Sequence, residues 1–337
     1  MWSFLYKRHI IVMVMLMKKI SIVVPMYNEQ EVAPLFFDAI TKVVDSLKDK
    51  YEFEIVAVND GSKDSTLSLL LEKQKELDHL VVVDLSRNWG HESAVLAGLQ
   101  TATGDAIIPM DADLQDPPEI IPQMIEMWED GYKVVNAKRG SRDKDTSFKK
   151  NTAGIYYKLL DSLSGKVKIP DNVANFRLID RQVLDEVLAL QEKNRVFRVE
   201  VPYVGFKTGE VLFAREERTK GESKYNFKAM FNLALSSIVS VSNNPLGWTI
   251  PLTIVSFIIT ILSIITELVF YILYKCNVFM GIDSFSYSIW LIVNVILLLA
   301  SFIFLTLGII AVYMMEVVTE SRGRPAVIIN KVYRKEK

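Results

Sequence analysis

The sequence has very little cysteine and histidine for its length. Of 337 residues, one is cysteine (Cys276) and three are histidine. An internal disulfide framework and a Cys- or His-rich metal centre are therefore excluded. Net charge is also nearly absent, at a formal −1, so we expect no nucleic-acid partner. Hydrophobic residues, by contrast, make up 50% of the chain, and they are unevenly distributed along it.

The first part of the chain alternates apolar runs of strand length with segments of helical length. The predicted strands cover residues 20–25, 53–58, 80–85, 105–110 and 133–137. Strands and helices that alternate at this spacing predict βαβ units, and hence an α/β domain with a mostly parallel sheet. Short polar clusters follow the strands directly, where ligands of open α/β sheets bind.

Two carboxylates, Asp111 and Asp113, follow the fourth predicted strand and are separated by one residue. Carboxylate oxygens suit Mg²⁺ or Mn²⁺, and these ions in turn hold phosphate oxygens. The pair therefore indicates a metal–diphosphate site. A solvated turn is the alternative, because aspartate is common in turns.

Five motifs, in order along the chain, resemble those of family 2 glycosyltransferases with the GT-A fold. They are VPMYNE, NDGSKDST, DADLQDPPE, NFRLIDR and RTKGESKY. More narrowly, the chain is similar to polyprenyl-phosphate glycosyltransferases, which include bactoprenol glucosyltransferases and dolichol-phosphate mannose synthases. The resemblance runs from about residue 18 to residue 324 and implies a Rossmann-like GT-A catalytic domain over residues 17–224.

The resemblance also implies which residues bind the donor. Nucleotide-sugar binding is expected from Pro25, Tyr27, Glu29, Asp60, Asp111 and Gln115. Asp113 would be the direct metal ligand, with Asp111 beside it. An Mg²⁺ or Mn²⁺ ion there would complete its shell with the donor's diphosphate and water. It would neutralise charge on the leaving nucleoside diphosphate. Helix capping and turn chemistry are the alternative for Glu29 and Asp60.

Residues 169–178 resemble the acceptor motif of the family. Asp171 is the candidate base, whereas Asn175 stands where an acid is frequent and is expected to orient the acceptor. Arg177 would bind the acceptor phosphate, because a guanidinium suits bidentate contact. An ion pair of Arg177 with Asp180 or Asp171 is the alternative. A phosphate monoester is already largely ionised near neutrality, so positioning can outweigh base catalysis.

Two basic segments are further candidates for phosphate contact. In the charge-dense segment 139–151, the resemblance suggests that Arg139 or Arg142 approaches phosphate, and a solvated loop is the alternative. The second set resembles the phosphate-binding residues of the family and comprises Arg215, Arg218, Ser223 and Lys224.

The last third of the chain carries the apolar excess. Residues 225–245 predict an amphipathic interfacial helix, with a core helix as the alternative. Within residues 246–316, the segments 249–273 and 288–315 each exceed the roughly 20 residues that cross a hydrocarbon core. They predict a C-terminal two-helix transmembrane hairpin. Basic residues in the tail, 317–337, place both ends and the catalytic domain in the cytoplasm by the positive-inside rule.

The predicted function is transfer of a single sugar, with inversion and metal dependence, to undecaprenyl or another polyprenyl phosphate. Glucose from UDP-glucose is the expected donor. GDP-mannose, a UDP-amino sugar and aminoarabinose are alternative donors, and a catalytically inactive membrane adaptor is a further alternative, to which Asn175 points. The protein is expected to be a multi-pass protein of the inner (cytoplasmic) membrane and a homo-oligomer, either a dimer or a tetramer.

Residues 1–16 are interpreted as an extension from an upstream start codon. They carry basic residues and a short apolar run, but no small-residue cleavage site of the kind that ends a signal peptide.

Overall fold

The computed structural model describes residues 17–140, 173–192, 195–213, 249–276 and 284–335. The chain forms two compact units, one of residues 1–240 with 325–337 and one of residues 241–324. The predicted extension at 1–16 and the predicted interfacial helix at 225–245 lie outside the described residues.

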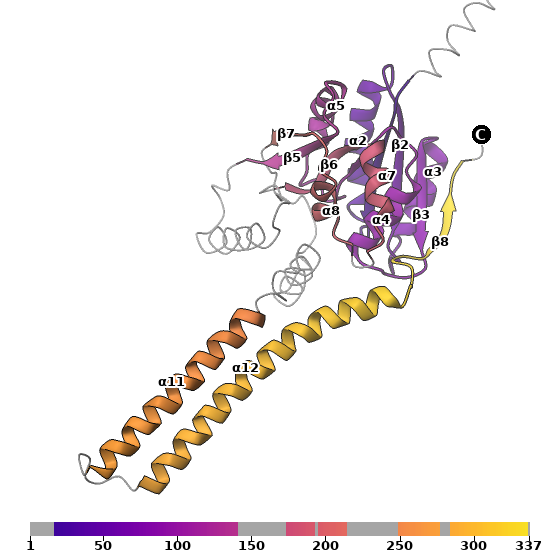
Figure 1. The fold of residues 1–337 in the computed structure, drawn as a ribbon. Helices are drawn as coiled ribbons and strands as arrows, with labels where there is room; N and C mark the ends of the chain where they lie inside the picture. Colours follow the sequence, from indigo (N-terminus) through magenta and orange to yellow (C-terminus); the bar gives the residue numbers. More distant parts are fainter. Residues whose placement is uncertain (1–16, 141–172, 193–194, 214–248, 277–283, 336–337) are drawn as a thin grey trace, which may run out of the picture. The chain divides into compact units, whose positions relative to one another are not determined.

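The first unit contains a mixed sheet with the strand order β7-β5-β6-β4-β1-β2-β3-β8 (Figure 1). Strands β1 to β4 are mutually parallel, and β5 pairs with β7 in parallel. Strand β6 runs antiparallel to β4 and β5, and β8 runs antiparallel to β3. The prediction of an α/β domain with a mostly parallel sheet is confirmed. The strands are β1 (Lys19–Met26), β2 (Glu52–Asn59), β3 (Leu80–Leu85), β4 (Ala106–Pro109), β5 (Val134–Arg139), β6 (Val173–Asp180), β7 (Thr208–Phe213) and β8 (Ile329–Tyr333).

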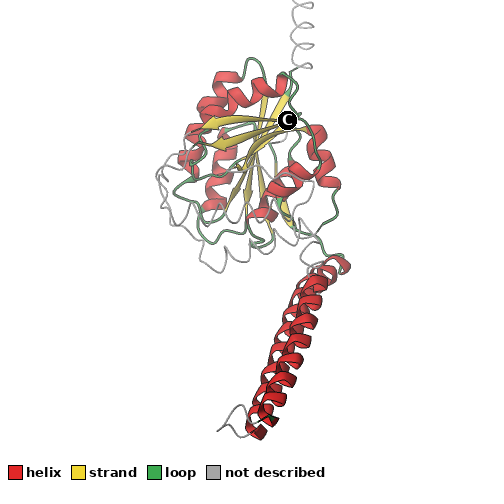
Figure 2. Cartoon of the chain, turned by 60° about the vertical axis from the view of Figure 1, so that its left-hand side comes forward, coloured by secondary structure: helices red, strands yellow, loops and turns green. Residues whose placement is uncertain are grey.

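Helices cover both faces of this sheet (Figure 2). One face packs against α2 (Ala33–Leu47), α3 (Thr66–Glu76) and α5 (Ile121–Glu129), which a 3₁₀ turn at Pro118–Ile120 precedes. The other face packs against α4 (His91–Thr101), α7 (Arg181–Ala189) and α8 (Phe197–Tyr203).

The central strands are mostly apolar because most of their side chains meet one of these two layers. In β1, Ile22 and Val24 point into the first layer and Val23 into the second, and all three are fully buried. Burial of each such side chain contributes about 1.5–3 kcal/mol. The alternation of side chains along a strand therefore explains why β1 has no polar face.

The two antiparallel strands were not predicted from the sequence. By sequence alone, residues 169–178 indicate only a motif, and residues 317–337 indicate only a basic tail. The structure instead places β8 on the free edge of β3, where Asn330 Nδ2 donates to Asp84 Oδ2 at 2.8 Å. The sheet unit therefore includes residues 325–337 as well as the predicted domain.

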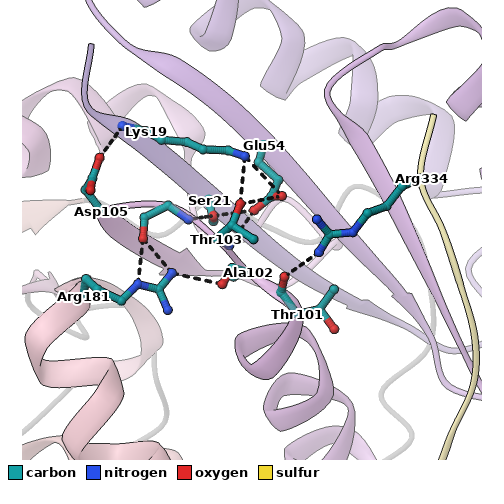
Figure 3. A network of polar contacts seen from close by, with 10 residues as sticks. Lys19, Ser21, Glu54, Thr101, Ala102, Thr103, Asp105, Arg181 and Arg334 are labelled. Carbon is teal, nitrogen blue, oxygen red and sulfur yellow. Dashed lines mark hydrogen bonds and ion pairs between the residues drawn. The ribbon is translucent and has the colours of Figure 1, made fainter. Parts of the chain in front are cut away.

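A buried polar network lies at the amino-terminal edge of the sheet (Figure 3). Glu54, only 4% exposed, accepts hydrogen bonds from Ser21 Oγ at 2.7 Å and from Thr103 N at 2.8 Å. Arg181 donates to the carbonyl of Ala102 at 3.0 Å, just beyond the last turn of α4. The network therefore holds the C-terminal end of α4 against the sheet.

Two long apolar helices, α11 (Thr249–Lys275) and α12 (Ser284–Ser321), make up the described part of the second unit and contact each other. By length and composition, one span among the described residues, Leu298–Ser321, could cross a membrane. The continuous apolar stretch found in α11, Ile254–Thr266, is shorter. The two-helix membrane hairpin therefore stays a prediction.

Candidate active site

The loops that follow β1 to β4 share one edge of the sheet, because these four strands run in the same direction. Strand β6 begins at this edge, since it runs the opposite way. It pairs with β4 through Ala106↔Asp180 and Ile107↔Ile179. Beyond the end of β4, Asn175 and Asp111 both lie close to His91 Nε2, at 3.2 and 3.6 Å. The predicted donor and acceptor motifs therefore meet at this edge.

The loops after β1 and β2 are fastened to each other by hydrogen bonds. The backbone N–H of Asn28 donates to Ser62 Oγ at 3.0 Å, and the N–H of Glu29 donates to Thr66 Oγ1 at 2.9 Å. Asn28 adopts a left-handed backbone conformation (φ 53°), which asparagine tolerates better than most residues. These contacts bring the first two predicted nucleotide motifs together.

Asp60 anchors the loop that leads into α4. Its carboxylate is buried, with 3% exposure, and accepts from the backbone N–H of Trp89 at 2.7 Å and of Gly90 at 3.0 Å. Burial raises the pKa of Asp60, and the two hydrogen bonds offset only part of that effect. Each carboxylate oxygen has a second lone pair. A nucleotide contact by Asp60 is thus compatible with this anchoring role and stays a prediction.

Two glycines permit the close approach of these loops. A Cβ on Gly61 would lie 2.4 Å from the carbonyl carbon of Arg87, which is too close for any side chain. Gly90 has φ 92°, a conformation that residues with a side chain rarely adopt. The segment from Arg87 to Gly90 is therefore set in place by backbone contacts, and α4 begins directly after it.

His91, the first residue of α4, is a site residue that the sequence analysis missed. Its Nε2 lies 3.2 Å from Asn175 Nδ2 and 3.6 Å from Asp111 Oδ1. The imidazole thus joins the acid of the donor motif to the amide of the acceptor motif. The three histidines are far apart in the sequence and were considered only as metal ligands. The position of His91 at the end of a polar loop after a strand was the signal that could have identified it.

The Asp111–Gln115 loop has the chemistry for a divalent cation but supplies few ligands. Asp113 Oδ1 accepts from the backbone N–H of Gln115 at 3.1 Å, and Leu114 lies in the left-handed region at φ 56°. Among the described residues, no group of three or more His, Cys, Asp or Glu side chains could hold a metal ion. Asp111 and Asp113 fit Mg²⁺ or Mn²⁺ if diphosphate oxygens and water complete the shell.

Arg177 lies inside the domain, with 1% exposure. Its guanidinium carbon is 5.5 Å from the ring centroid of Phe197 in α8. Burial lowers the pKa of Arg177 to about 9, so the side chain remains cationic at neutral pH. Asp180, a proposed ion-pair partner, instead lies 3.0 Å from Lys133 Nζ and accepts from Trp128 Nε1 at 2.8 Å. Contact of Arg177 with an acceptor phosphate stays a prediction.

The remaining predicted site residues are placed as follows. Pro25 and Tyr27 lie at the end of β1 and in the loop after it, and both are half-buried. Arg139 ends β5, and its side chain is outside the description. The candidates outside the described residues are Arg142, Asp171, Arg215, Arg218, Ser223 and Lys224.

Comparison with known proteins places the chain in a family. The family model described as Glycosyl transferase family 2 matches residues 21–188. The uncharacterized glycosyltransferase YkcC of Bacillus subtilis is 38% identical over 313 residues, which cover 93% of this chain and 94% of that protein. The bactoprenol glucosyl transferase of Shigella phage SfII is 39% identical over 332 residues, covering 94% and 99%. The chain belongs to glycosyl transferase family 2 and is a glycosyltransferase.

Solved structures with a similar fold are more distant. Glucosyl-3-phosphoglycerate synthase from Mycobacterium tuberculosis, in complex with Mg²⁺ and uridine diphosphate, has a TM-score of 0.46 and 17% identity, covering 65% of this chain and 75% of that chain. The mannosyltransferase PcManGT from Pyrobaculum calidifontis, in complex with GDP-Man and Mn²⁺, has a TM-score of 0.41 and 16% identity, covering 90% and 87%. At this distance neither structure carries an argument about ligands.

Proposed function

We propose that this glycosyltransferase transfers one glucose from UDP-glucose to a polyprenyl phosphate at the cytoplasmic face of a membrane. The observation that carries the proposal is near-full-length similarity, at 36–39% identity, to three phage proteins named bactoprenol glucosyl transferase. The convergence of Asp60, Asp111 and Asn175 at one sheet edge supports it. Association with a membrane follows from the polyprenyl nature of the acceptor.

The proposed reaction is a direct displacement. An oxygen of the lipid phosphate attacks the anomeric carbon, the bond from that carbon to the diphosphate oxygen breaks, and the electron pair leaves with the nucleoside diphosphate. Configuration at the carbon inverts. The attacking phosphate is already largely ionised because its second pKa is about 6. The protein's main task is therefore to position donor and acceptor.

Asp111 and Asp113 would hold a divalent cation at the donor diphosphate. Mg²⁺ or Mn²⁺ would supply charge neutralisation on the leaving group. Asp60 keeps the adjoining loop in place through the N–H groups of Trp89 and Gly90.

The exposed side chains of the second unit support the proposal that this unit inserts into a lipid bilayer. Its helices expose large apolar side chains such as Phe257 (66%) and Phe304 (73%). Extended apolar surfaces of this kind mark contact with a membrane or with another protein. In a bilayer, their transfer from water is favourable by about 25 cal/mol per Å².

The pairing of strand β8 with β3 supports the proposal that α11 and α12 form a two-span membrane hairpin. The chain enters α11 after the sheet domain, passes through α12, and returns to pair with β3 in the same domain. A segment that begins and ends in one folded domain crosses a membrane an even number of times. With the span at Leu298–Ser321 as one crossing, α11, with 27 residues, is the proposed second crossing. Assembly into a dimer or tetramer stays a prediction.

The single cysteine offers a direct test of this topology. Cys276 directly follows α11 and is exposed. A membrane-impermeant thiol reagent is expected to label it in spheroplasts and not in sealed inside-out vesicles. A Cys276→Ser/Lys331→Cys variant, with its thiol on β8, is expected to show the reverse pattern. Labelling of both thiols from the same side would contradict the hairpin.

The reaction is tested by lipid-linked product formation in membranes. The assay contains undecaprenyl phosphate, Mg²⁺ or Mn²⁺, and one labelled nucleotide sugar at a time. We expect glucose to appear on the lipid phosphate with the wild type. Product should vanish with Asp113→Ala and persist with Asp130→Ala, which removes an exposed acid that follows α5. Absence of product with every donor, despite binding of UDP, would refute the proposal.

A further inference from the structure

His91 and Asn175 form a polar pair between the two halves of the site. His91 belongs to the loop–helix junction that Asp60 anchors, and Asn175 belongs to β6, which leads in from the acceptor motif. The nearest acid recorded for the pair is Asp111, 3.6 Å from His91 Nε2. In a displacement reaction, the group between the donor diphosphate and the acceptor phosphate is the sugar.

The pair is held on rigid elements rather than on a free loop. The start of α4 follows the Trp89–Gly90 segment that Asp60 fastens, and its end is bound by Arg181 through the carbonyl of Ala102. Glu92, beside His91, accepts from the backbone N–H of Phe197 in α8 at 3.3 Å. A side chain supported in this way can discriminate between ligands that differ by one hydroxyl group.

Asn175 presents hydrogen-bonding capacity that the described part of the chain does not use. The residue is 8% exposed, and its Oδ1 is buried without a hydrogen-bond partner among the described residues. Buried acceptors of this kind are normally satisfied, so a ligand donor is the natural complement. His91 retains 36% of its side-chain exposure, which leaves the imidazole accessible to the same ligand.

The chemistry of the pair fits hydroxyl groups better than phosphate. An amide and an imidazole each offer a donor and an acceptor, which matches a hydroxyl that both donates and accepts. Phosphate binding favours side chains with a permanent positive charge, and neither an amide nor an imidazole carries one.

We propose that His91 and Asn175 bind hydroxyl groups of the sugar being transferred and thereby select the donor. The inference rests on the proposed function, which it deepens by assigning the sugar subsite of the same reaction. It moves Asn175 from the acceptor side, where the sequence placed it, to the sugar. It also gives His91 a direct contact with substrate.

Binding of UDP and of UDP-glucose to the full chain in detergent, with Mn²⁺ present, tests the proposal. The proteins are the wild type, His91→Ala, His91→Gln, Asn175→Ala and the control Gln100→Ala, an exposed position at the far end of α4. We expect the wild type and the control to bind UDP-glucose more tightly than UDP. Both alanine variants should bind UDP like the wild type but lose about tenfold in affinity for UDP-glucose, as expected for one hydrogen bond. His91→Gln, which keeps a donor and an acceptor, should lose less.

Competition between UDP-glucose and its epimer UDP-galactose gives a second readout. The wild type should prefer one epimer, and the alanine variants should discriminate less. Thermal unfolding checks that each variant is folded. If Asn175→Ala does not fold, the variants at His91 decide the question, because the His91 side chain is only partly buried.

Two results would overturn the proposal. One is an unchanged affinity of His91→Ala for both UDP and UDP-glucose, including the case in which the wild type itself gains nothing from the sugar. The other is an equal loss of affinity for both ligands, which would mean that His91 acts through Asp111. Failure of the proposed function is distinguishable, because it is absence of lipid-linked product from the wild type. The binding ratios are measured without turnover.

Discussion

The two edges of the central sheet carry the same kinds of polar residue. They differ in which groups satisfy the hydrogen-bonding capacity of these residues. At the amino-terminal edge, the Glu54 carboxylate is 4% exposed and is surrounded by donors from its own chain (Figure 3). At the carboxyl-terminal edge, the Asp111 side chain remains 44% exposed, beside His91. A closed network stabilises the fold, whereas an accessible cluster of polar groups is available to a ligand. Exposure and contacts therefore distinguish the structural acid Glu54 from the candidate site acid Asp111.

The pKa values of the buried acids at the two edges are also shifted in opposite directions. Burial alone would raise the pKa of Glu54, but hydrogen bonds from Thr103 and Ser21, together with the Lys19 ammonium, leave its pKa below the usual value. Burial raises the pKa of Asp60, for which two backbone N–H groups compensate only in part. The difference follows from the larger number of hydrogen bonds that Glu54 accepts.

Helix α4 connects the two edges. Its last turn is tied into the amino-terminal network through Arg181, and Arg334, just after β8, donates to the carbonyl of Thr101 at 2.9 Å. Its first residue is His91. The closed edge therefore contributes to the site by fixing the helix that carries the imidazole.

The largest expected effect is on activity, from an acid of the open edge. Asp113→Asn should lower the rate of lipid-linked product formation by about 10³-fold, because the loss of a charge partner at the leaving group costs several kcal/mol. The melting temperature should stay within about 2 °C of the wild type, as for a surface change. The matched control is Asp105→Asn at the opposite end of β4. Among the described residues, its carboxylate accepts only from the backbone N–H of Lys19. Retained activity in Asp113→Asn, or lost activity in the control, would contradict the comparison.

The second effect is on stability, from the closed edge. Glu54→Gln should lower the free energy of unfolding by about 2–3 kcal/mol. Both carboxylate oxygens of Glu54 accept hydrogen bonds, whereas an amide accepts only through its single oxygen and carries no charge. Activity per folded molecule should be retained. Thermal unfolding of the purified chain measures the change, and Glu52→Gln, exposed at the start of the same strand, is the neutral control. Loss of activity with no loss of stability would show that the closed edge has a functional role.

A smaller effect is expected from the attachment of β8. Asn330→Ala removes the donor to Asp84 Oδ2 and leaves that acid, 7% exposed, with one recorded partner fewer. We expect a loss of about 1–2 kcal/mol in the free energy of unfolding. Lys331→Ala, exposed on the same strand, should cost less than about 0.5 kcal/mol. Equal unfolding temperatures for the two variants would argue against a stabilising role for the Asn330 contact.

The smallest effect is the pH dependence of the two buried acids. Because the folded pKa of Glu54 is lowered from 4.5, its stabilising contribution is complete above that value and is lost as pH falls through the folded pKa. The folded pKa of Asp60 is raised from 3.8, so protonation at falling pH relieves a cost in the folded state. The destabilisation by Glu54→Gln should therefore shrink below pH 4.5, whereas that by Asp60→Asn should grow as pH falls towards 4. Melting temperatures measured from pH 7 down to about pH 3 test both signs, and parallel curves would contradict the assignment.

The parallel strands were predictable because each shows its own local pattern. Strands β1 to β3 are mostly apolar runs covered on both faces, and each is followed by a short polar cluster. That pattern is local, so the sequence predicted these strands to within two residues of their observed ends. It also predicted that Asp60, Asp111 and Asp113 follow strand ends.

The antiparallel strands were missed because their pairing partners are remote in sequence. Strand β8 lies about 250 residues from β3, and its burial pattern has no fully buried position. Strand β6 contains Asn175 and Arg177, two polar residues that its own sequence gives no reason to bury. Only the sheet and the helices packed on it provide their surroundings.

The sequence by itself determined the α/β class, the order of the glycosyltransferase motifs and the acids at the strand ends, because strand length and turn chemistry are encoded over a few neighbouring residues. Only the tertiary structure decided that β8 closes the sheet, that Asp60 holds the loop before α4, and that His91 meets Asn175 and Asp111. These contacts join residues between 20 (His91 and Asp111) and 246 positions apart. Their distances depend on the packing of the whole sheet and not on any local pattern.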